Sequence, residues 1–311
     1  MDFVQLPGTD LTVSRFCLGA GAFGTSVTGS AADRLVAAFV EAGGTFFDTA
    51  HCYAFWVPGG LGASERELAA SLRRVGALGD CVIATKGGHP DCGPDYRRPY
   101  DFLAESVIDS DIEDSLDRLR VDRIDLYYLH RDDGRTPVGE IVERLNRQVE
   151  RGRIRALGAS NWSVARMAAA NAYAEARGLQ GFAISQAQWS LSEPGWRQTA
   201  DPSMRRVGEE EIAWHAHTGI PIAAYSATGG GYFARTLAES ASPRNRALWR
   251  QVGALSDELG CTPTQVAVAW LLHQRPYVIP LFSTASTSHL AEVLDSGQIG
   301  LDPTMLANLN P

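Results

Sequence analysis

Short apolar runs alternate with longer amphipathic stretches along the whole chain. The short runs are rich in Val, Ile, Leu, Phe and Tyr and are bounded by Gly, Asp or Pro, which is typical of buried β-strands. There are eight of them, at Arg15–Leu18, Phe46–Thr49, Cys81–Thr85, Ile124–Leu129, Ile154–Gly158, Phe182–Gln186, Ile220–Ala224 and Tyr277–Leu281.

Apolar residues with helical spacing fill the intervals between these runs. The predicted helices are Ala31–Ala42, Ser64–Arg74, Ser106–Leu119, Val138–Arg151, Ser163–Arg177, Glu209–Thr218, Asn245–Leu259, Thr264–His273, Thr287–Ser296 and a short final one at Pro303–Leu309. Local signals support two starts: Ser64 precedes first-turn acidic residues, and Thr262 precedes a proline.

The alternation predicts parallel strands with helices outside them. Eight such units in 311 residues fit a closed (β/α)8 TIM barrel better than an open sheet. A hairpin is expected before the first barrel strand, from Phe3–Leu6 and Leu11–Val13 joined by a turn. No linker divides the chain, so we predict one barrel domain over residues 1–311 that ends in a short C-terminal tail.

A glycine-rich segment offers an alternative fold. Gly19 to Gly24 matches G-x-G-x-x-G after a strand, and Asp48 follows some two dozen residues later, as in a dinucleotide-binding Rossmann fold. That motif needs its last glycine inside the helix that holds the pyrophosphate, whereas residues 25–30 intervene here before the helical pattern. We favour a tight exit from a barrel strand and keep a Rossmann-type dehydrogenase as the alternative.

The composition excludes several classes of function. The chain is 45% hydrophobic and 21% charged, and its apolar runs are too short to span a bilayer. No basic and apolar leader precedes the first strand, so we expect no signal peptide. A formal charge of -8 argues against nucleic-acid or anionic-membrane partners and favours small-molecule chemistry.

The cysteines bear on location and on metals. Five widely spaced cysteines are typical of a reducing cytoplasm. His89 and Cys92 are three residues apart, but no second pair completes a four-ligand set at the usual spacing. We therefore predict a cytoplasmic protein without a metal site.

Four polar residues fall where barrel strands end, at the mouth that the strands share. Asp48 ends the second strand, Tyr53 lies in the loop after it, Lys86 ends the third and His130 ends the fourth. A tyrosine is a poor proton donor unless its phenolate is stabilised, and an ammonium held by a carboxylate does that. A histidine can hydrogen-bond a carbonyl oxygen as charge builds on it. No Cys, Ser or metal site supplies a nucleophile, so a hydride cofactor is implied.

Longer motifs extend this hypothesis. The runs Gly44–Tyr53, Gly62–Glu65, Arg118–His130 and Gly152–Asn161 occur in an order and spacing that resemble the aldo-keto reductase superfamily over nearly the whole chain. The resemblance implies a (β/α)8 barrel that uses NAD(P)H to reduce aldehydes or ketones, or oxidises alcohols in reverse. It assigns Tyr53 as general acid/base, Lys86 and Asp48 as its tuning pair, and His130 as the group that orients the carbonyl.

The resemblance also implies cofactor contacts. Ser160, Asn161 and Gln186 match the partners of the nicotinamide carboxamide, Tyr225 matches the aromatic stacked on the ring, and the loop after it matches the pyrophosphate loop. The full implied set is Ala22, Phe23, Asp48, Ser160, Asn161, Gln186, Tyr225, Ser226, Ala227, Thr228, Gly229, Gly231, Ser283, His289 and Glu292.

The segment that the resemblance places at the adenine end of the cofactor departs from the family pattern. Val293 stands where an asparagine is customary, and no Lys or Arg lies between Leu281 and Val293 to pair with a 2′-phosphate. The loop from Ser226 to Tyr232 also lacks a basic residue. We therefore leave NADP versus NAD open and expect a weaker hold on the cofactor.

The predicted substrate is a small carbonyl or alcohol. Aromatic walls with polar groups suit a sugar or cyclitol. The predicted pocket residues are Phe23, Phe55, Trp56, His89, Arg131 and Trp162. The short end of the chain leaves specificity to the loops or to a partner subunit, and monomer or homo-oligomer stays undecided. A cofactor-binding regulatory subunit with little turnover is the alternative from another functional class.

Overall fold

Eight parallel strands close into a barrel. The computed structural model describes residues 1–192, 203–235, 242–275 and 277–310. The barrel order is β10-β3-β4-β5-β6-β7-β8-β9. The strands are β3 (Cys17–Gly19), β4 (Phe46–Asp48), β5 (Val82–Gly87), β6 (Ile124–Leu129), β7 (Ile154–Ser160), β8 (Phe182–Gln188), β9 (Ile222–Tyr225) and β10 (Val278–Phe282). The predicted (β/α)8 class is confirmed, and the Rossmann alternative is wrong because the sheet is closed rather than open.

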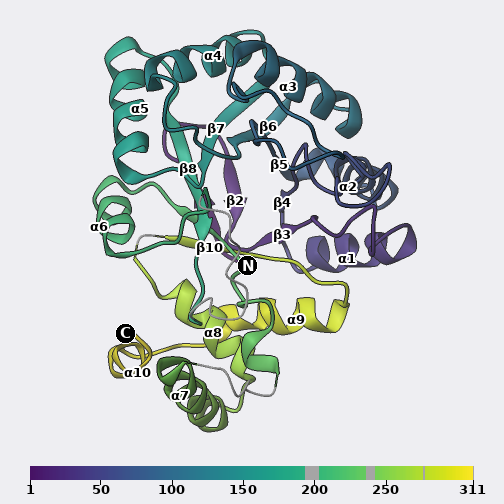
Figure 1. The fold of residues 1–311 in the computed structure, drawn as a ribbon. Helices are drawn as coiled ribbons and strands as arrows, with labels where there is room; N and C mark the ends of the chain where they lie inside the picture. The colour runs from purple at the N-terminus through teal and green to yellow at the C-terminus, as the bar shows by residue number, and fades with distance from the viewer. Residues whose placement is uncertain (193–202, 236–241, 276, 311) are drawn as a thin grey trace.

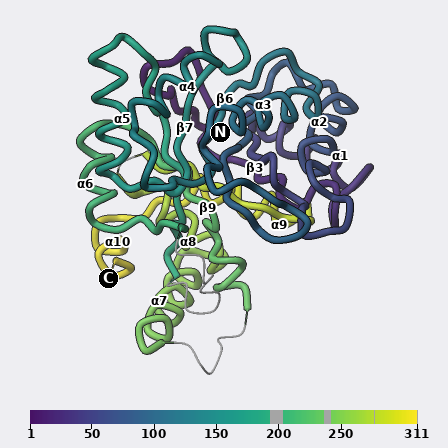
Figure 2. Tube along the Cα trace, turned by 45° about the horizontal axis from the view of Figure 1, so that its top comes forward, coloured from purple at the N-terminus to yellow at the C-terminus, as the bar shows by residue number. Residues whose placement is uncertain are grey.

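Helices surround the barrel (Figure 1). They are α1 (Ser30–Glu41), α2 (Ala63–Arg74), α3 (Glu105–Leu119), α4 (Val138–Glu150), α5 (Val164–Arg177), α6 (Glu209–Thr218), α7 (Pro243–Leu259), α8 (Pro263–Leu272), α9 (Thr287–Asp295) and α10 (Pro303–Leu309). Short 3-10 turns lie at Leu78–Asp80, Tyr232–Ala234 and Ser296–Gln298. In Figure 2, α7 stands at the edge of the molecule beyond α8. Within the described ranges, every helix is too short or too polar to cross a bilayer.

The N-terminal hairpin closes one end of the barrel. β1 (Phe3–Gln5) pairs antiparallel with β2 (Thr12–Ser14), as predicted. Its Leu6, Leu11 and Val13 pack in one cluster with barrel-interior residues such as Phe46 and Leu126. These barrel residues lie toward the N-terminal ends of their strands, so the hairpin covers that end and leaves the C-terminal end for a pocket.

The starts of two helices show where local signals decide and where they do not. Thr262 caps α8 as predicted, and Gln265 completes a capping box with it. Ser64 does not cap α2, which begins at Ala63 after Gly62. The buried Ser64 hydroxyl instead donates to the Ala20 carbonyl at 2.6 Å, so a tertiary contact between α2 and the segment after β3 uses the group that the sequence suggested as a cap.

The glycine-rich segment is the exit from β3. It forms turns, and α1 begins only at Ser30. Gly24 has φ +75°, and a Cβ there would lie 2.5 Å from the Ala63 carbonyl oxygen. The glycine therefore allows close approach to the start of α2, which confirms the barrel-exit interpretation.

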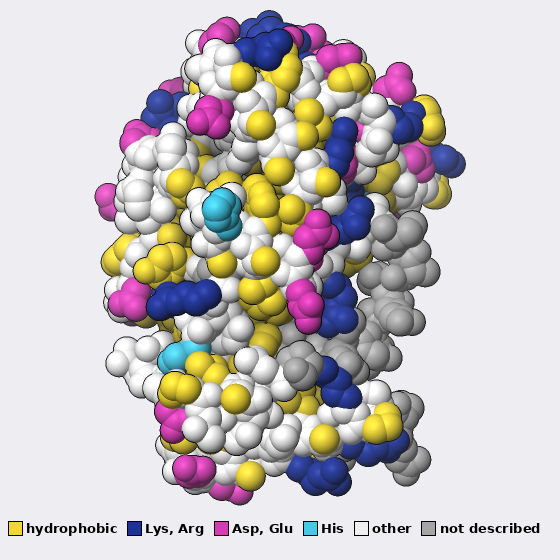
Figure 3. Space-filling view, turned by 90° about the vertical axis from the view of Figure 1, so that its left-hand side faces the viewer, with side chains coloured by type: hydrophobic (Ala, Val, Ile, Leu, Met, Phe, Trp, Pro, Cys, Tyr) yellow, Lys and Arg dark blue, Asp and Glu magenta, His cyan; other side chains and the backbone are white. Residues whose placement is uncertain are grey.

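Charge is spread over the surface seen from the side of α5 and α6. Acidic and basic side chains are interspersed on that face (Figure 3). The pattern is that of an ordinary solvated surface rather than a field of one sign.

Candidate active site

The four predicted catalytic residues meet at the C-terminal mouth of the barrel. Lys86 lies near the end of β5, and its Nζ donates to Asp48 Oδ1 at 2.5 Å, to the Thr49 carbonyl at 2.8 Å and to Tyr53 Oη at 3.0 Å. The ring centroids of His130 and Tyr53 are 5.9 Å apart. Asp48 and Lys86 are each only 1% exposed. The structure thus brings together the set that the strand ends predicted.

Lys86 is the single lysine among 28 basic residues of the chain. Burial alone would lower the pKa of its ammonium, but Asp48 and Tyr53 beside it raise that pKa above its ordinary value. Burial raises the pKa of Asp48, against the opposing effects of Lys86 and of a 2.9 Å hydrogen bond from Gln186 Nε2. Asp48 and Lys86 therefore form a buried ion pair, and Lys86 also contacts the phenol of Tyr53.

Tyr53 and His130, the other two residues of the predicted set, stay uncharged at neutral pH. Burial raises the pKa of Tyr53 above its ordinary value even though Lys86 lowers it, so the net direction is opposite to that of the ammonium alone. Burial, reinforced by His89 and Arg131, holds the pKa of His130 well below its usual range. Tyr53 therefore keeps a proton that it can donate, and His130 is an uncharged imidazole.

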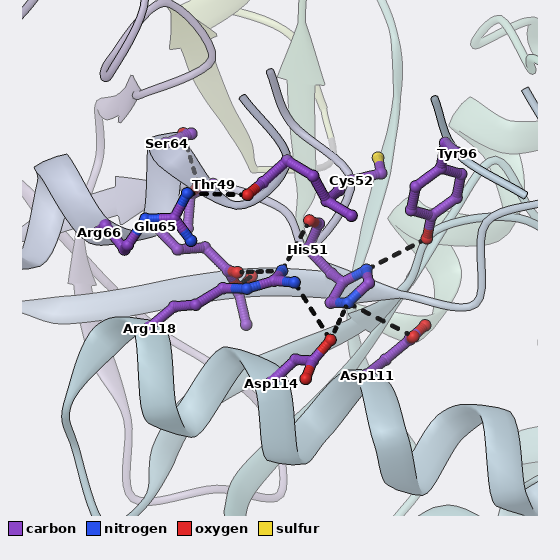
Figure 4. A network of polar contacts seen from close by, with 12 residues as sticks. Thr49, His51, Cys52, Ser64, Glu65, Arg66, Tyr96, Asp111, Asp114 and Arg118 are labelled. Atoms are coloured by element: carbon purple, nitrogen blue, oxygen red, sulfur yellow. Dashed lines mark hydrogen bonds and ion pairs between the residues drawn. The ribbon is translucent and has the colours of Figure 1, made fainter. Parts of the chain in front are cut away.

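A polar network holds the segment that carries Tyr53 (Figure 4). The His51 ring contacts Tyr96 Oη at 3.1 Å through Nδ1 and Asp114 Oδ2 at 2.9 Å through Nε2. Arg118 from α3 donates to the His51 carbonyl at 3.0 Å and pairs with the buried Glu65 at 3.2 Å. The sequence did not reveal this network, because its members come from two separate loops and from helices α2 and α3. The network therefore fixes the backbone of the loop between β4 and α2, which also carries Tyr53.

A cavity of about 450 Å³ opens beside these residues. The predicted residues on its wall are Tyr53, Phe55, Trp56, His89, His130, Arg131, Ser160, Asn161, Gln186, Tyr225, Ser226, Ala227, Thr228 and Ser283. Five further wall residues were not predicted, namely Cys52, Met204, Gly230, Leu281 and Phe282. The catalytic set and most of the implied cofactor set therefore share one cavity.

Asn161 is held firmly within that wall. Its Oδ1 accepts from Tyr225 Oη at 2.9 Å and from the Arg205 backbone at 3.0 Å, and its Nδ2 donates to Ser160 Oγ at 3.0 Å. Asn161 and Ser226 both have positive φ, at 60° and 59°. Such backbone geometry in non-glycine residues is costly and is typical of functional sites.

Two predicted pocket residues lie elsewhere. Phe23 is 1% exposed and packs in the hydrophobic core with Val27, so its assignment to the pocket wall is corrected. Trp162 stacks edge-on against Phe182 at 5.1 Å and beneath the Arg166 guanidinium, so it too is a core residue. In both cases a large apolar ring gains more from burial beneath helices than from exposure at the mouth.

The remaining implied cofactor residues are away from the described cavity wall. Ala22 lies in the turns after β3. Gly229 and Gly231 have positive φ, and a Cβ on Gly229 would come within 2.3 Å of Ser192 Oγ. His289 and Glu292 lie on α9, where Glu292 Oε1 accepts from Thr262 Oγ1 at 2.6 Å.

Sequence reasoning also missed a basic residue near the loop after β9. Arg235 follows the predicted loop in sequence, yet its Nε lies 3.9 Å from the position that a Cβ would take on Gly231. The 3-10 turn Tyr232–Ala234 folds the chain back and produces this approach. A guanidinium therefore stands beside a loop that has no basic residue of its own.

Comparison with known proteins gives consistent matches. A model of the Aldo/keto reductase family matches residues 15–310. A protein described as an uncharacterized oxidoreductase, YrpG of Bacillus subtilis (strain 168), is 29% identical over 100% of this chain and 95% of its own length. The aldo-keto reductase ausK of Emericella nidulans is 27% identical over 93% of this chain and 76% of its own, and that of Aspergillus calidoustus is 29% identical over 91% and 74%.

Proposed function

The chain belongs to the aldo/keto reductase family, and from that premise we propose that it transfers hydride between a nicotinamide cofactor and a small carbonyl or alcohol. The family and its relatives support an oxidoreductase in general. The proposal of hydride transfer rests on the hydrogen bonds that link Asp48 to Lys86 and Lys86 to Tyr53. Tyr53 lines the same cavity as Asn161 and Gln186.

The cavity suits a nicotinamide dinucleotide. Anchored amides at Asn161 and Gln186 offer donors and acceptors for a carboxamide, and Tyr225 presents a ring at the wall. The loop of small residues from Ser226 allows a backbone to approach phosphate oxygens, with the Arg235 guanidinium nearby. When bound, the cofactor supplies or accepts the hydride that no side chain of the protein can provide.

The protein's own residues handle the proton. In carbonyl reduction, Tyr53 donates its phenolic proton to the carbonyl oxygen, and the Lys86 ammonium at 3.0 Å stabilises the phenolate that remains. Asp48 keeps the ammonium charged and fixed. His130, as a neutral imidazole, donates a hydrogen bond that orients the carbonyl. In alcohol oxidation the same groups act in reverse.

Replacing the phenol tests this role. Tyr53→Phe removes only the hydroxyl, so we expect kcat for carbonyl reduction to fall by about 10²- to 10⁴-fold while cofactor affinity is unchanged. Tyr100→Phe is the matched control, because that side chain is 77% exposed and is not among the residues of the cavity wall. Full activity in Tyr53→Phe contradicts the proposed proton donor.

We propose little discrimination between NADH and NADPH. No Lys or Arg lies from Leu281 to Val293 to pair with a 2′-phosphate, and the same segment carries the acidic Glu292. Separate fluorescence titrations with the two cofactors measure the preference, which we expect to be within about tenfold, or about 1.4 kcal/mol. A hundredfold preference for NADPH overturns this part.

The wall favours a polyhydroxylated substrate such as a sugar or cyclitol. Phe55 and Trp56 pack edge-on at 5.4 Å on one side, while His89 and Arg131 supply polar groups in the same cavity. Aromatic faces bind the apolar faces of sugar rings, and the polar groups bind hydroxyls. Screening sugars, cyclitols and simple aldehydes in both directions, by absorbance of the reduced cofactor, tests the class. Activity confined to apolar aldehydes rejects it.

A further inference from the structure

Three soft donor groups converge on the floor of the cavity. One ligand atom each from Cys52, His89 and His130 lies within 4.8 Å of the other two. All three residues line the cavity wall, so an ion can reach them from solvent. Spacing in the sequence did not reveal the set, because its members follow three different strands.

The distance between two of the donors already suits tetrahedral coordination. Cys52 Sγ lies 3.6 Å from His130 Nδ1. A tetrahedral zinc ion with Zn–S of about 2.3 Å and Zn–N of about 2.1 Å separates such atoms by about 3.6 Å. The third donor, on His89, lies no more than 4.8 Å from the other two, so coordination requires it to move by at most about 1.4 Å.

The hydrogen bond of the His89 ring to the backbone is also typical of a metal ligand. Its Nδ1 lies 3.0 Å from the Pro90 carbonyl oxygen, which accepts a hydrogen bond only if Nδ1 carries the proton. In that tautomer Nε2 carries the lone pair used in coordination. Histidine ligands to metals are typically fixed by such a bond to a backbone carbonyl.

Cys52 is turned toward this cluster by the network behind it. In Figure 4 the His51 side chain points into the polar network, while the neighbouring Cys52 sulfur points away from it. The backbone of the pair is held by the hydrogen bond from His51 N to the Lys86 carbonyl at 2.9 Å. The thiol is therefore presented to the cavity by a fixed segment.

We propose that Cys52, His89 and His130 bind a zinc ion, as one thiolate and two imidazoles with water in the fourth position. The thiol proton passes to solvent as the Zn–S bond forms. This assignment departs from the absence of a metal site expected from sequence spacing. The ion and its water occupy the volume beside Tyr53 and hold the His130 ring, so zinc competes with the carbonyl substrate.

Cobalt(II) reports the site directly, without turnover. Titrating the full-length protein with Co²⁺ should give a thiolate-to-cobalt charge-transfer band together with the visible bands of tetrahedral cobalt, and Zn²⁺ should displace both. Cys52→Ser should abolish the charge-transfer band, and His89→Gln should weaken zinc affinity by at least about 10- to 100-fold. No band in the wild-type protein at saturating Co²⁺ overturns the proposal, whatever the variants do.

Cys92→Ser is the matched control. Its sulfur lies 3.3 Å from His89 Nδ1 but outside the proposed ligand set, so this variant should keep the charge-transfer band. Loss of the band in Cys92→Ser, with retention in Cys52→Ser, refutes the assigned ligands. Circular dichroism of each variant separates loss of a ligand from loss of the fold.

The inhibition rests on the proposed function and is measured separately. Zinc should raise KM for the carbonyl without changing kcat, and a chelator should restore activity. A cobalt spectrum without any turnover leaves the metal site standing and rejects the enzyme proposal. Turnover that zinc does not inhibit, together with an intact cobalt spectrum, rejects only the position assigned to the ion relative to substrate.

Discussion

Removing the charge of Lys86 is the most informative perturbation of the proposed mechanism. Lys86→Met keeps the length and apolar stem of the side chain and deletes the ammonium that contacts Asp48, Thr49 and Tyr53. The contacts of Lys86 with Asp48 and Thr49 are buried and its contact with Tyr53 is partly buried, so water does not replace the lost charge freely. Both the acidity of Tyr53 and the stability of the fold should respond.

The distance sets the size of the catalytic effect. A unit charge 3.0 Å from the phenolate oxygen is worth about 5.5 kcal/mol at an effective dielectric constant of about 20, which is about 10⁴ in rate. The Asp48 charge opposes part of this, so we expect kcat for reduction to fall by about 10²- to 10⁴-fold. The pKa of Tyr53, already raised by burial, should rise further.

The assay compares both reaction directions over pH. Alcohol oxidation needs the phenolate, so its rate rises as pH passes the pKa of Tyr53, and in Lys86→Met that rise should move to higher pH. Cofactor affinity, measured by fluorescence, should change little. Urea unfolding should show a loss of up to about 3–5 kcal/mol, because Asp48 is left buried without its partner.

A double variant separates stability from catalysis. Lys86→Met combined with Asp48→Asn removes both buried charges, so stability should return while activity stays low. Recovery of activity in the double variant, or a loss in Lys86→Met of less than tenfold, would refute the role given to the ammonium.

Two further predictions concern stability. In the folded protein the pKa of His130 lies well below 6.5, so below about pH 6.5 the unfolded chain binds more protons than the folded one. The free energy of unfolding should therefore fall by up to about 1.4 kcal/mol per pH unit from this group. Urea unfolding of His130→Gln should show a shallower dependence of this free energy on pH between pH 7 and 5, and an unchanged dependence contradicts the neutral imidazole. Thr262→Ala loses the cap of α8 and its bond to Glu292, which should cost about 1–2 kcal/mol in the same assay, whereas the exposed Thr304→Ala should cost little.

The fold was predictable because each strand carries its own apolar pattern and each helix its own period. Residues such as Lys86 and His130 could be placed together because a parallel barrel delivers every strand end to one mouth. The same logic does not say which way an aromatic ring turns, so Phe23 and Trp162 were misplaced. The approach of Arg235 to Gly231 depends on a loop that folds back, and no periodicity encodes such a contact.

The network around His51 and the cluster at Cys52 show a second limit. Each brings together residues that are distant in sequence, and none of these residues indicates the cluster when it is considered alone. The neighbours of Ser64 predict a helix cap, yet its hydrogen-bond partner Ala20 lies 44 positions away. Local signals predict a helix cap correctly where the side chain hydrogen-bonds to its own helix, as at Thr262. They fail where a residue distant in sequence takes that hydrogen bond instead.

Because Lys86 is the single lysine of the chain, its ε-amine is also a unique spectroscopic label. A protein grown with lysine enriched in nitrogen-15 at Nζ yields one side-chain nitrogen resonance, and that resonance belongs to the buried ion pair. Its chemical shift reports the protonation of Nζ directly, as pH, cofactor or zinc is varied, without assignment of any other signal. Amine-reactive reagents, in turn, find an ε-amine nowhere on the folded surface, so their reaction at Lys86 measures how often the site opens.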